Sequence, residues 1–194
     1  MSLEIIVYCR EVSQNLIPQM LDKLNDYDMV AEVHPEFMFD QENDSGFLPF
    51  KFTFLNTHFN ILKDKHLLSG FELYIDDFDL QITNESIKPK PSLLNRLLGQ
   101  KYEVRFSPPE QEIKLKDCKK AVRFIWHSAD TFQLRFALLT SAILTELTNG
   151  VCTYTADDIW CDNQDITNRT FKEVIEYESS LKESEIKFFE FQKW

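Results

Sequence analysis

The sequence predicts an α+β fold in one domain spanning residues 1–194, with a mixed β-sheet packed against helices. Short segments with alternating apolar side chains recur along the chain, which is the pattern of half-buried strands. One segment near residues 131–149 is apolar on most of its faces, which is typical of a buried helix. The 194 residues are 43% hydrophobic and include 17 Phe, so they suffice for an aromatic-rich core.

A β-α-β pattern begins the chain. Residues 3–9 are rich in β-branched side chains and predict a buried strand. Residues 14–26 carry apolar side chains on one helical face, and Ser13 is placed to cap that helix. Residues 29–33 then predict a second, short strand.

Alternating apolar residues predict the next strands. In residues 47–55, three Phe share one face of the predicted strand. Residues 71–82 alternate in the same way, except for a slip of one residue at 76–77. Such a slip indicates either a β-bulge or a turn, and the sequence leaves both open.

Residues 84–101 contain the best candidate for an internal boundary. Two prolines and a glycine flank a short Leu-rich helical turn there. Residues 102–106 alternate as a strand that Pro108-Pro109 ends. Residues 110–120 are charged and alternate only loosely, and residues 122–126 predict a further strand.

The clearest helix is the apolar segment near residues 131–149. Asp130 is a plausible N-cap, and Gly150 stands where a helix stop is expected. Residues 151–154 predict a short strand. A last, C-terminal helix is expected to begin near Asp165 and to run to about residue 185.

Charge is unevenly spread along the chain. The formal net charge is −11, made of −10 over residues 1–80, +5 over residues 81–128 and −6 over residues 129–194. A field of one sign attracts partners of the other sign and repels its own. The two acidic flanks therefore point to a basic protein partner.

The same pattern argues against nucleic acid as a partner. Ten basic residues with interleaved aromatics in residues 81–128 could hold a single strand. Five acids lie within that stretch, however, and both flanks repel phosphate. We expect the basic middle to be an internal electrostatic complement or a solvated face.

No catalytic or cofactor motif is present. None of the four His has a Ser, Cys or acid at a recognised catalytic spacing, and the four Cys form no C-x-x-C pair. Carboxylates cluster at residues 76–79 and 157–165, and such clusters can bind a divalent metal ion, but no EF-hand pattern surrounds them. We expect no catalytic residue, no metal and no cofactor, and we read these carboxylates as solvated surface or helix caps.

The N-terminus lacks the basic region and apolar length of a signal peptide, and no run reaches the length of a membrane span. The expected location is therefore cytoplasmic, with no membrane partner. Oligomeric state is not predicted.

Two acidic segments are the first candidates for a binding surface, because binding residues concentrate on loops and an aromatic among charges supplies an anchor. One segment lies beside Phe39, and the other contains Trp160, whose alternative role is packing over the core. The predicted partner-binding residues are Asp40, Glu42, Asp44, Asp157, Asp158, Trp160 and Asp162.

The C-terminal third resembles a known group of proteins. Within Leu147–Tyr154, a buried helix ends in a T-x-G-V turn and a short strand follows. Ala156–Trp160 then forms an acidic loop, and a charged helix comes next. Over about residues 130–194, this pattern resembles small cytoplasmic bacterial proteins, some of which are immunity proteins of polymorphic or contact-dependent growth-inhibition toxin systems. The resemblance implies a non-enzymatic inhibitor of one cognate toxin domain, and it assigns no site residues.

The charge distribution leads to the same expectation by a separate route. Many toxin domains are nucleases with basic clefts, and an acidic inhibitor covers such a cleft with fast, steered association. We therefore expect a toxin-neutralising immunity protein. Two alternatives stay open, an enzyme of unrecognised type with a carboxylate-rich site and a scaffold or regulatory module.

Overall fold

The computed structural model describes residues 3–39, 46–87, 105–162 and 164–194. Short 3₁₀ turns lie at Asn60–Leu62 and Glu183–Glu185. The helices are α1 (Leu16–Asn25), α2 (Leu80–Ser86), α4 (Pro109–Leu115), α5 (Gln133–Thr148) and α6 (Ile166–Ser180). The strands are β1 (Leu3–Cys9), β2 (Met29–Val33), β3 (Gly46–Phe54), β4 (Leu67–Asp77), β5 (Lys120–Trp126), β6 (Val151–Tyr154), β7 (Ile159–Cys161) and β8 (Phe189–Glu190).

One sheet contains all of these strands, in the order β2-β3-β4-β5-β1-β6-β7, with β8 paired to the start of β4. The α+β class and the predicted order β1-α1-β2 are confirmed. Every pairing between described strands is antiparallel, where the sequence suggested a mixed sheet. The reason is that α1 carries the chain from β1 to the far edge, so β1 and β2 are never neighbours.

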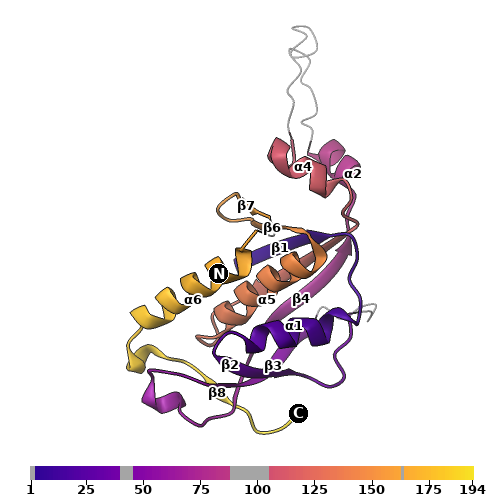
Figure 1. Ribbon diagram of the computed structural model, residues 1–194. Coiled ribbons are helices and arrows are strands. Elements are labelled where there is room, and N and C mark those ends of the chain that lie inside the picture. The colour runs from indigo at the N-terminus through magenta and orange to yellow at the C-terminus, as the bar shows by residue number, and fades with distance from the viewer. Residues whose placement is uncertain (1–2, 40–45, 88–104, 163) are drawn as a thin grey trace, which may run out of the picture.

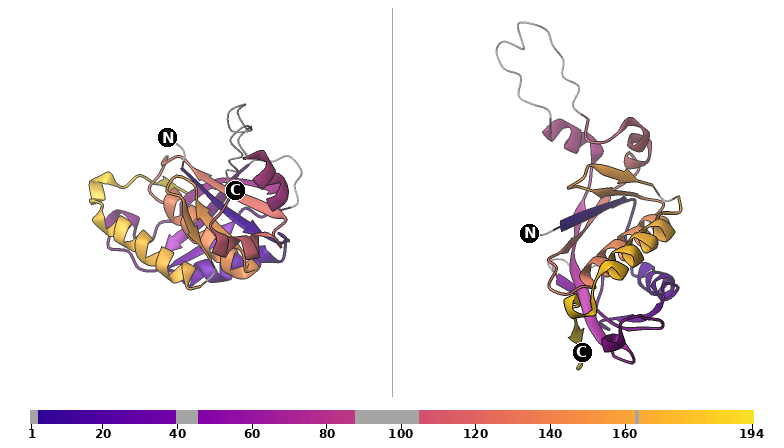
Figure 2. Two further views of the ribbon diagram at one scale, coloured as in Figure 1. Left: turned by 90° about the horizontal axis from the view of Figure 1, so that it is seen from above. Right: turned by 90° about the vertical axis from the view of Figure 1, so that its left-hand side faces the viewer.

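Helices α1, α5 and α6 form a layer on one face of the sheet (Figure 1), and Figure 2 shows that layer edge-on. Helix α5 contacts β1, β4, β5 and β6 and is flanked by α1 and α6. Its side chains are buried on nearly every face, as predicted. The remaining helices α2 and α4 lie together at one end of the molecule.

The buried helix begins and ends close to the predicted positions, but its N-cap is Phe132 and not Asp130. Asp130 Oδ1 accepts hydrogen bonds from the backbone N–H groups of Phe132 at 2.7 Å and Gln133 at 3.1 Å. At the other end, Asn149 adopts a left-handed φ of 51°, and the Gly150 N–H donates to Thr145 O at 2.9 Å. The polar groups that a helix leaves open at its termini are thereby satisfied.

Aromatic rings fill the space between α5 and the sheet. The Phe136 ring stacks on Phe50 with centroids 4.6 Å apart and meets Phe52 edge-on at 4.9 Å. Phe132 meets Phe52 and Phe54 in the same edge-on manner. Rings in these offset and edge-on arrangements attract one another beyond their burial of area.

A buried ion pair joins α5 to α6. The Arg135 guanidinium donates to both oxygens of Glu178, at 2.9 and 2.8 Å, and its third nitrogen donates to Tyr27 O at 3.1 Å. It also lies between the rings of Phe54 and Phe171, 5.0 and 5.7 Å from their centroids. The charges are thus fully paired out of water, the condition under which a buried pair persists.

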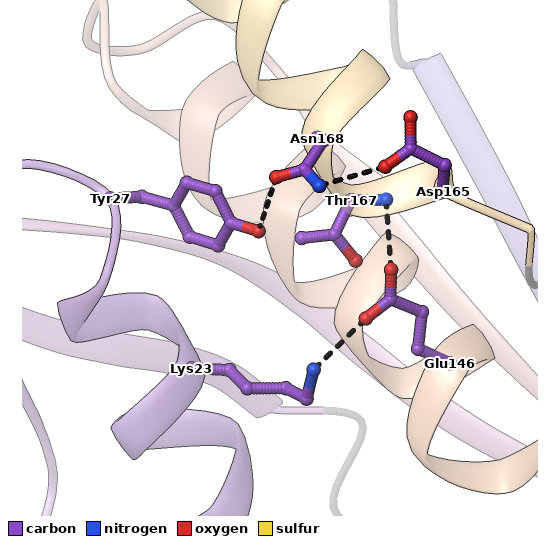
Figure 3. Close-up of polar contacts among 6 residues, drawn as sticks. All are labelled: Lys23, Tyr27, Glu146, Asp165, Thr167 and Asn168. Carbon is purple, nitrogen blue, oxygen red and sulfur yellow. Dashed lines mark hydrogen bonds and ion pairs between the residues drawn. The ribbon is translucent and has the colours of Figure 1, made fainter.

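A second polar network ties α1, α5 and the start of α6 together (Figure 3). Glu146 is its centre: one carboxylate oxygen is 3.0 Å from Lys23 Nζ, and the other accepts from the Thr167 N–H at 3.2 Å. Asn168 donates to Asp165 at 2.7 Å and accepts from the Tyr27 hydroxyl at 3.3 Å. Three helices are therefore joined by side chains that water partly reaches.

This network predicts a loss of stability in acid. Burial alone would raise the pKa of Glu146, but hydrogen bonds from Thr167 and Lys23 outweigh it and hold the pKa below 4.5. A carboxyl whose pKa is lowered by folding stabilises the protein above its unfolded pKa and stops doing so as pH falls through its folded pKa. Denaturant unfolding measured between neutral pH and pH values below 4.5 should show a smaller acid loss for Glu146→Gln than for the wild type. An identical acid loss in both proteins would contradict the assignment.

The structure decides one open alternative and corrects two predictions. The slip at 76–77 is a turn: β4 ends at Asp77, and Asp79 accepts from two backbone N–H groups to begin α2. Residues 110–120 contain α4, because Pro109 occupies its first turn with acids beside it. The last helix ends at Ser180, because Leu181 is extended and the 3₁₀ turn at Glu183–Glu185 is separate.

Two predictions fall partly outside the described residues. The candidate boundary at 84–101 lies outside them from residue 88 onward, and the strand predicted at 102–106 lies outside them up to residue 104. Phe106 itself belongs to no strand. It packs in a second, smaller cluster beneath α2 and α4, built on Tyr8 of β1 and Val151 of β6. Since β1 and β6 also serve the main core, one sheet supports both clusters.

Candidate functional site

Basic residues of the middle segment, residues 81–128, form ion pairs with acids of both flanking segments. This confirms the predicted internal electrostatic complement for the described residues that pair. The exposed ends of these side chains make each pair a weak contributor to stability. The pairs are Lys120–Asp77 at 2.7 Å, Arg123–Asp76 at 2.9 Å, Arg123–Glu4 at 3.7 Å and Lys114–Asp162 at 3.6 Å.

The carboxylates at 76–79 have structural roles. Asp76 and Asp77 pair with basic residues of β5, and Asp79 caps α2. Within the described ranges, no group of three or more His, Cys, Asp or Glu is arranged to hold a metal ion. In the same ranges, no helix has the length and apolar character needed to cross a membrane.

The structure describes only one of the two predicted binding segments. Asp40, Glu42 and Asp44 lie outside the described residues. Phe39, expected as the aromatic beside them, is buried in the core against Phe37. The other segment is the β6–β7 hairpin, at the end of the sheet order.

Asp157 and Asp158 form the exposed tip of this hairpin. The turn closes with the Asp157 N–H donating to Tyr154 O at 3.2 Å, and Asp158 has a left-handed φ of 52°. Neither carboxylate forms an ion pair with a described basic residue, whereas Asp162 is compensated by Lys114. Beside them, Ile159 has 47% of its surface exposed. The hairpin tip therefore presents two negative charges without an ion-pair partner among the described residues, next to an exposed apolar side chain.

Trp160 faces the second cluster. Its ring stacks on Tyr8 with centroids 6.1 Å apart, meets Phe106 edge-on at 5.5 Å, and donates from Nε1 to Asp158 at 3.2 Å. The side chain is half-buried. The inner face of Trp160 therefore packs over a core, which was the alternative role for this residue. Only the rest of its surface is available to a partner.

We expect Trp160→Ala to destabilise the protein by about 1–2 kcal/mol, since a half-buried aromatic loses part of the usual burial energy. Denaturant unfolding measures this, and Trp160→Phe, which keeps a ring against Tyr8, should cost less. An alanine variant as stable as the wild type would show that the packing contributes nothing.

A pocket of about 340 Å³ opens beside the hairpin, between β1, β5, the β6–β7 hairpin and helices α5 and α6. Its polar groups are Glu4, Asp157, Arg169, Thr170 and Glu173. Its apolar walls are Leu3, Trp126, Leu134, Leu138, Tyr154, Ala156, Ile159, Cys161 and Ile166.

Two titratable side chains that line this pocket, Tyr154 and Cys161, are uncharged at neutral pH. Burial raises the pKa of Tyr154, and the neighbouring Cys152 and Glu173 raise it further. Burial also raises the pKa of the Cys161 thiol, which lies opposite Cys152 in the hairpin register. The charged groups of the lining, which we call the rim, are Glu4, Asp157, Arg169 and Glu173.

No family model, curated protein or solved structure matches the chain. The function is therefore inferred from the chain's own residues. The pocket brings Asp157 together with Arg169 and Glu173 of α6, which the sequence prediction missed. Their spacing of four residues on one helix face was the available signal, but nothing in the sequence placed that face beside the hairpin.

The cysteines should react slowly with thiol reagents in the folded protein. Burial raises the pKa of Cys9 to about 12 and that of Cys118 to about 11, and the thiolate is the reactive form. Cys161 alone among the four is not fully buried. Alkylation near pH 8, followed by peptide mass mapping, should modify Cys161 first and the others only after unfolding. Rapid native modification of Cys9 would contradict the packing around it.

Proposed function

We propose that this protein is a non-enzymatic, acidic inhibitor that binds a basic partner domain, in the manner of an immunity protein that neutralises a cognate toxin. The observation that supports the proposal best is the hairpin tip. Asp157 and Asp158 are exposed without a described basic partner, and they directly precede the exposed Ile159. Negative charge around an apolar contact suits a basic protein surface.

Electrostatics would set the rate of this association. Lys114, Lys120 and Arg123 of the middle segment pair with four acids of the flanks, and the flanks keep a large surplus of negative charge. Such a surplus accelerates encounter with a positive cleft and is screened by salt. A nuclease toxin domain, whose cleft must hold phosphate, is the partner class that this charge suits. We place such an inhibitor in the cytoplasm, where it would meet that toxin.

The test first asks whether a neighbouring gene encodes a basic toxin domain, and then uses that domain. Stopped-flow association should slow steeply as salt rises, and co-expression should restore growth of cells that make the toxin. The site variant is Asp157→Lys with Asp158→Asn, because Asn tolerates the left-handed backbone of residue 158. The matched control is Asp22→Lys with Glu176→Gln, which makes the same charge change on exposed residues of α1 and α6.

We expect the site variant to slow association several-fold more than the control, with unfolding of both variants close to wild type. Equal slowing by both pairs would show that the hairpin tip is not the contact. Absence of any complex with the neighbouring toxin domain would overturn the proposed function.

A further inference from the structure

We propose that the pocket beside the β6–β7 hairpin binds a free small organic cation with an apolar body, such as an arylalkylammonium. This goes beyond the proposed protein-binding function and does not depend on it. The inference rests on the shape of the pocket, on the chemistry of its walls, and on the imbalance of charge at its rim.

The walls are suited to an apolar body. Side chains from strands, hairpin and helices converge there, among them Trp126 of β5 and Leu134 and Leu138 of α5. The volume of about 340 Å³ is within the range of small-molecule sites, which are mostly apolar with a few polar groups. Filling this space would remove apolar surface from water.

The charged side chains at the rim favour a ligand of positive charge. Glu4 is already paired with Arg123 at 3.7 Å, and Arg169 donates to Gln164 O at 3.3 Å. Asp157 and Glu173 have no ion-pair partner among the described residues. The lining thus contains two unpaired carboxylates and one guanidinium, so a cationic head group gains net attraction and an anionic one meets net repulsion.

The placement of these groups also limits the cost of binding. Asp157, Arg169 and Glu173 are all exposed, so a cation at the rim keeps much of its hydration while its body is buried. Head-group contacts of this exposed kind contribute modestly, and burial of the body supplies most of the affinity. The ligand therefore needs both an apolar body and a positive head.

The experiment compares three probes with one body: 3-phenylpropylammonium, 3-phenylpropanol and 3-phenylpropanoate. Binding is read from Trp126 fluorescence in a Trp160→Phe, Trp194→Phe background and from protection of Cys161 against alkylation, since Trp126 and Cys161 line the pocket. We expect the ammonium to bind roughly fivefold more tightly than the carboxylate, with the alcohol between them. Equal affinity of the three, tighter binding of the carboxylate, or no protection of Cys161 would overturn the proposal.

Two variants test the rim directly. Asp157→Asn and Glu173→Gln should each reduce the preference for the ammonium over the alcohol by about twofold and leave the affinity of the alcohol unchanged. Glu176→Gln, an exposed carboxylate of the same helix outside the pocket, should change neither. If the control variant lowers the preference as much as Glu173→Gln does, the rim assignment is wrong.

A competition arm separates a free ligand from a side chain of the protein partner. Formation of a ternary complex of probe, protein and toxin domain supports a free ligand. Displacement of the toxin domain by the probe would show that the pocket belongs to the protein interface. Probe binding alone needs no partner, so failure of this proposal and failure of the proposed function remain distinguishable.

Discussion

Arg135→Ala is expected to lower the free energy of unfolding by about 3–5 kcal/mol, because it leaves the Glu178 carboxylate buried without a counter-charge. Only 1% of the Arg135 side chain and 7% of the Glu178 side chain are exposed. The same change removes the hydrogen bond to Tyr27 O and the contacts with the rings of Phe54 and Phe171. Urea unfolding followed by circular dichroism measures the loss.

The control is the partly exposed ion pair Lys51–Glu32, at 2.9 Å, for which Lys51→Ala should cost no more than about 1 kcal/mol. The paired variant Arg135→Met with Glu178→Leu should lose much less than the sum of Arg135→Ala and Glu178→Ala, since no charge stays buried alone. Purely additive effects would show that the two side chains do not interact in the way the structure indicates.

Phe136→Ala is the second large loss that we expect, again about 3–5 kcal/mol, because it opens a cavity at the centre of the core. The ring is fully buried and contacts both Phe50 and Phe52 of β3. The contrast is Phe189→Ala, in which 54% of the residue is exposed and the change should stay within about 0.5 kcal/mol. Comparable losses for both variants would mean that the Phe136 rings do not form the core contacts described.

The helices and strands that were predicted correctly have strong local signals. The α5 helix could be predicted from its apolar faces and from Asp130 and Gly150 at its ends, because these signals lie within the segment itself. The sequence left a β-bulge and a turn open at 76–77, and the turn is correct; the alternation continues past it because the first turn of α2 also spaces its apolar residues two apart. The pairing of β4 with β5, which ends at Asp77, decides between a continued strand and a turn.

The site was harder to predict for a related reason. Asp157 and Asp158 could be singled out from local charge, and they do lie at an exposed tip. Their relation to Arg169 and Glu173 depends on how α6 packs against α5, and no local pattern encodes that packing. Trp160 shows the same limit, since its position over Tyr8 joins segments more than a hundred residues apart.

The position of β1 in the middle of the sheet has a consequence for the timing of folding. Its two neighbours are β5, where Leu3 pairs with Trp126, and β6, where Ile5 pairs with Tyr154. At the usual speed of synthesis, roughly 5–20 residues per second, β1 waits about 6–25 s before β5 has been made. During that interval its apolar side chains have no strand beside them, and pairing across so long a stretch of chain is slow in itself. Newly made protein therefore passes through an aggregation-prone period, in which a chaperone that shields the first strand would raise the yield of folded molecules.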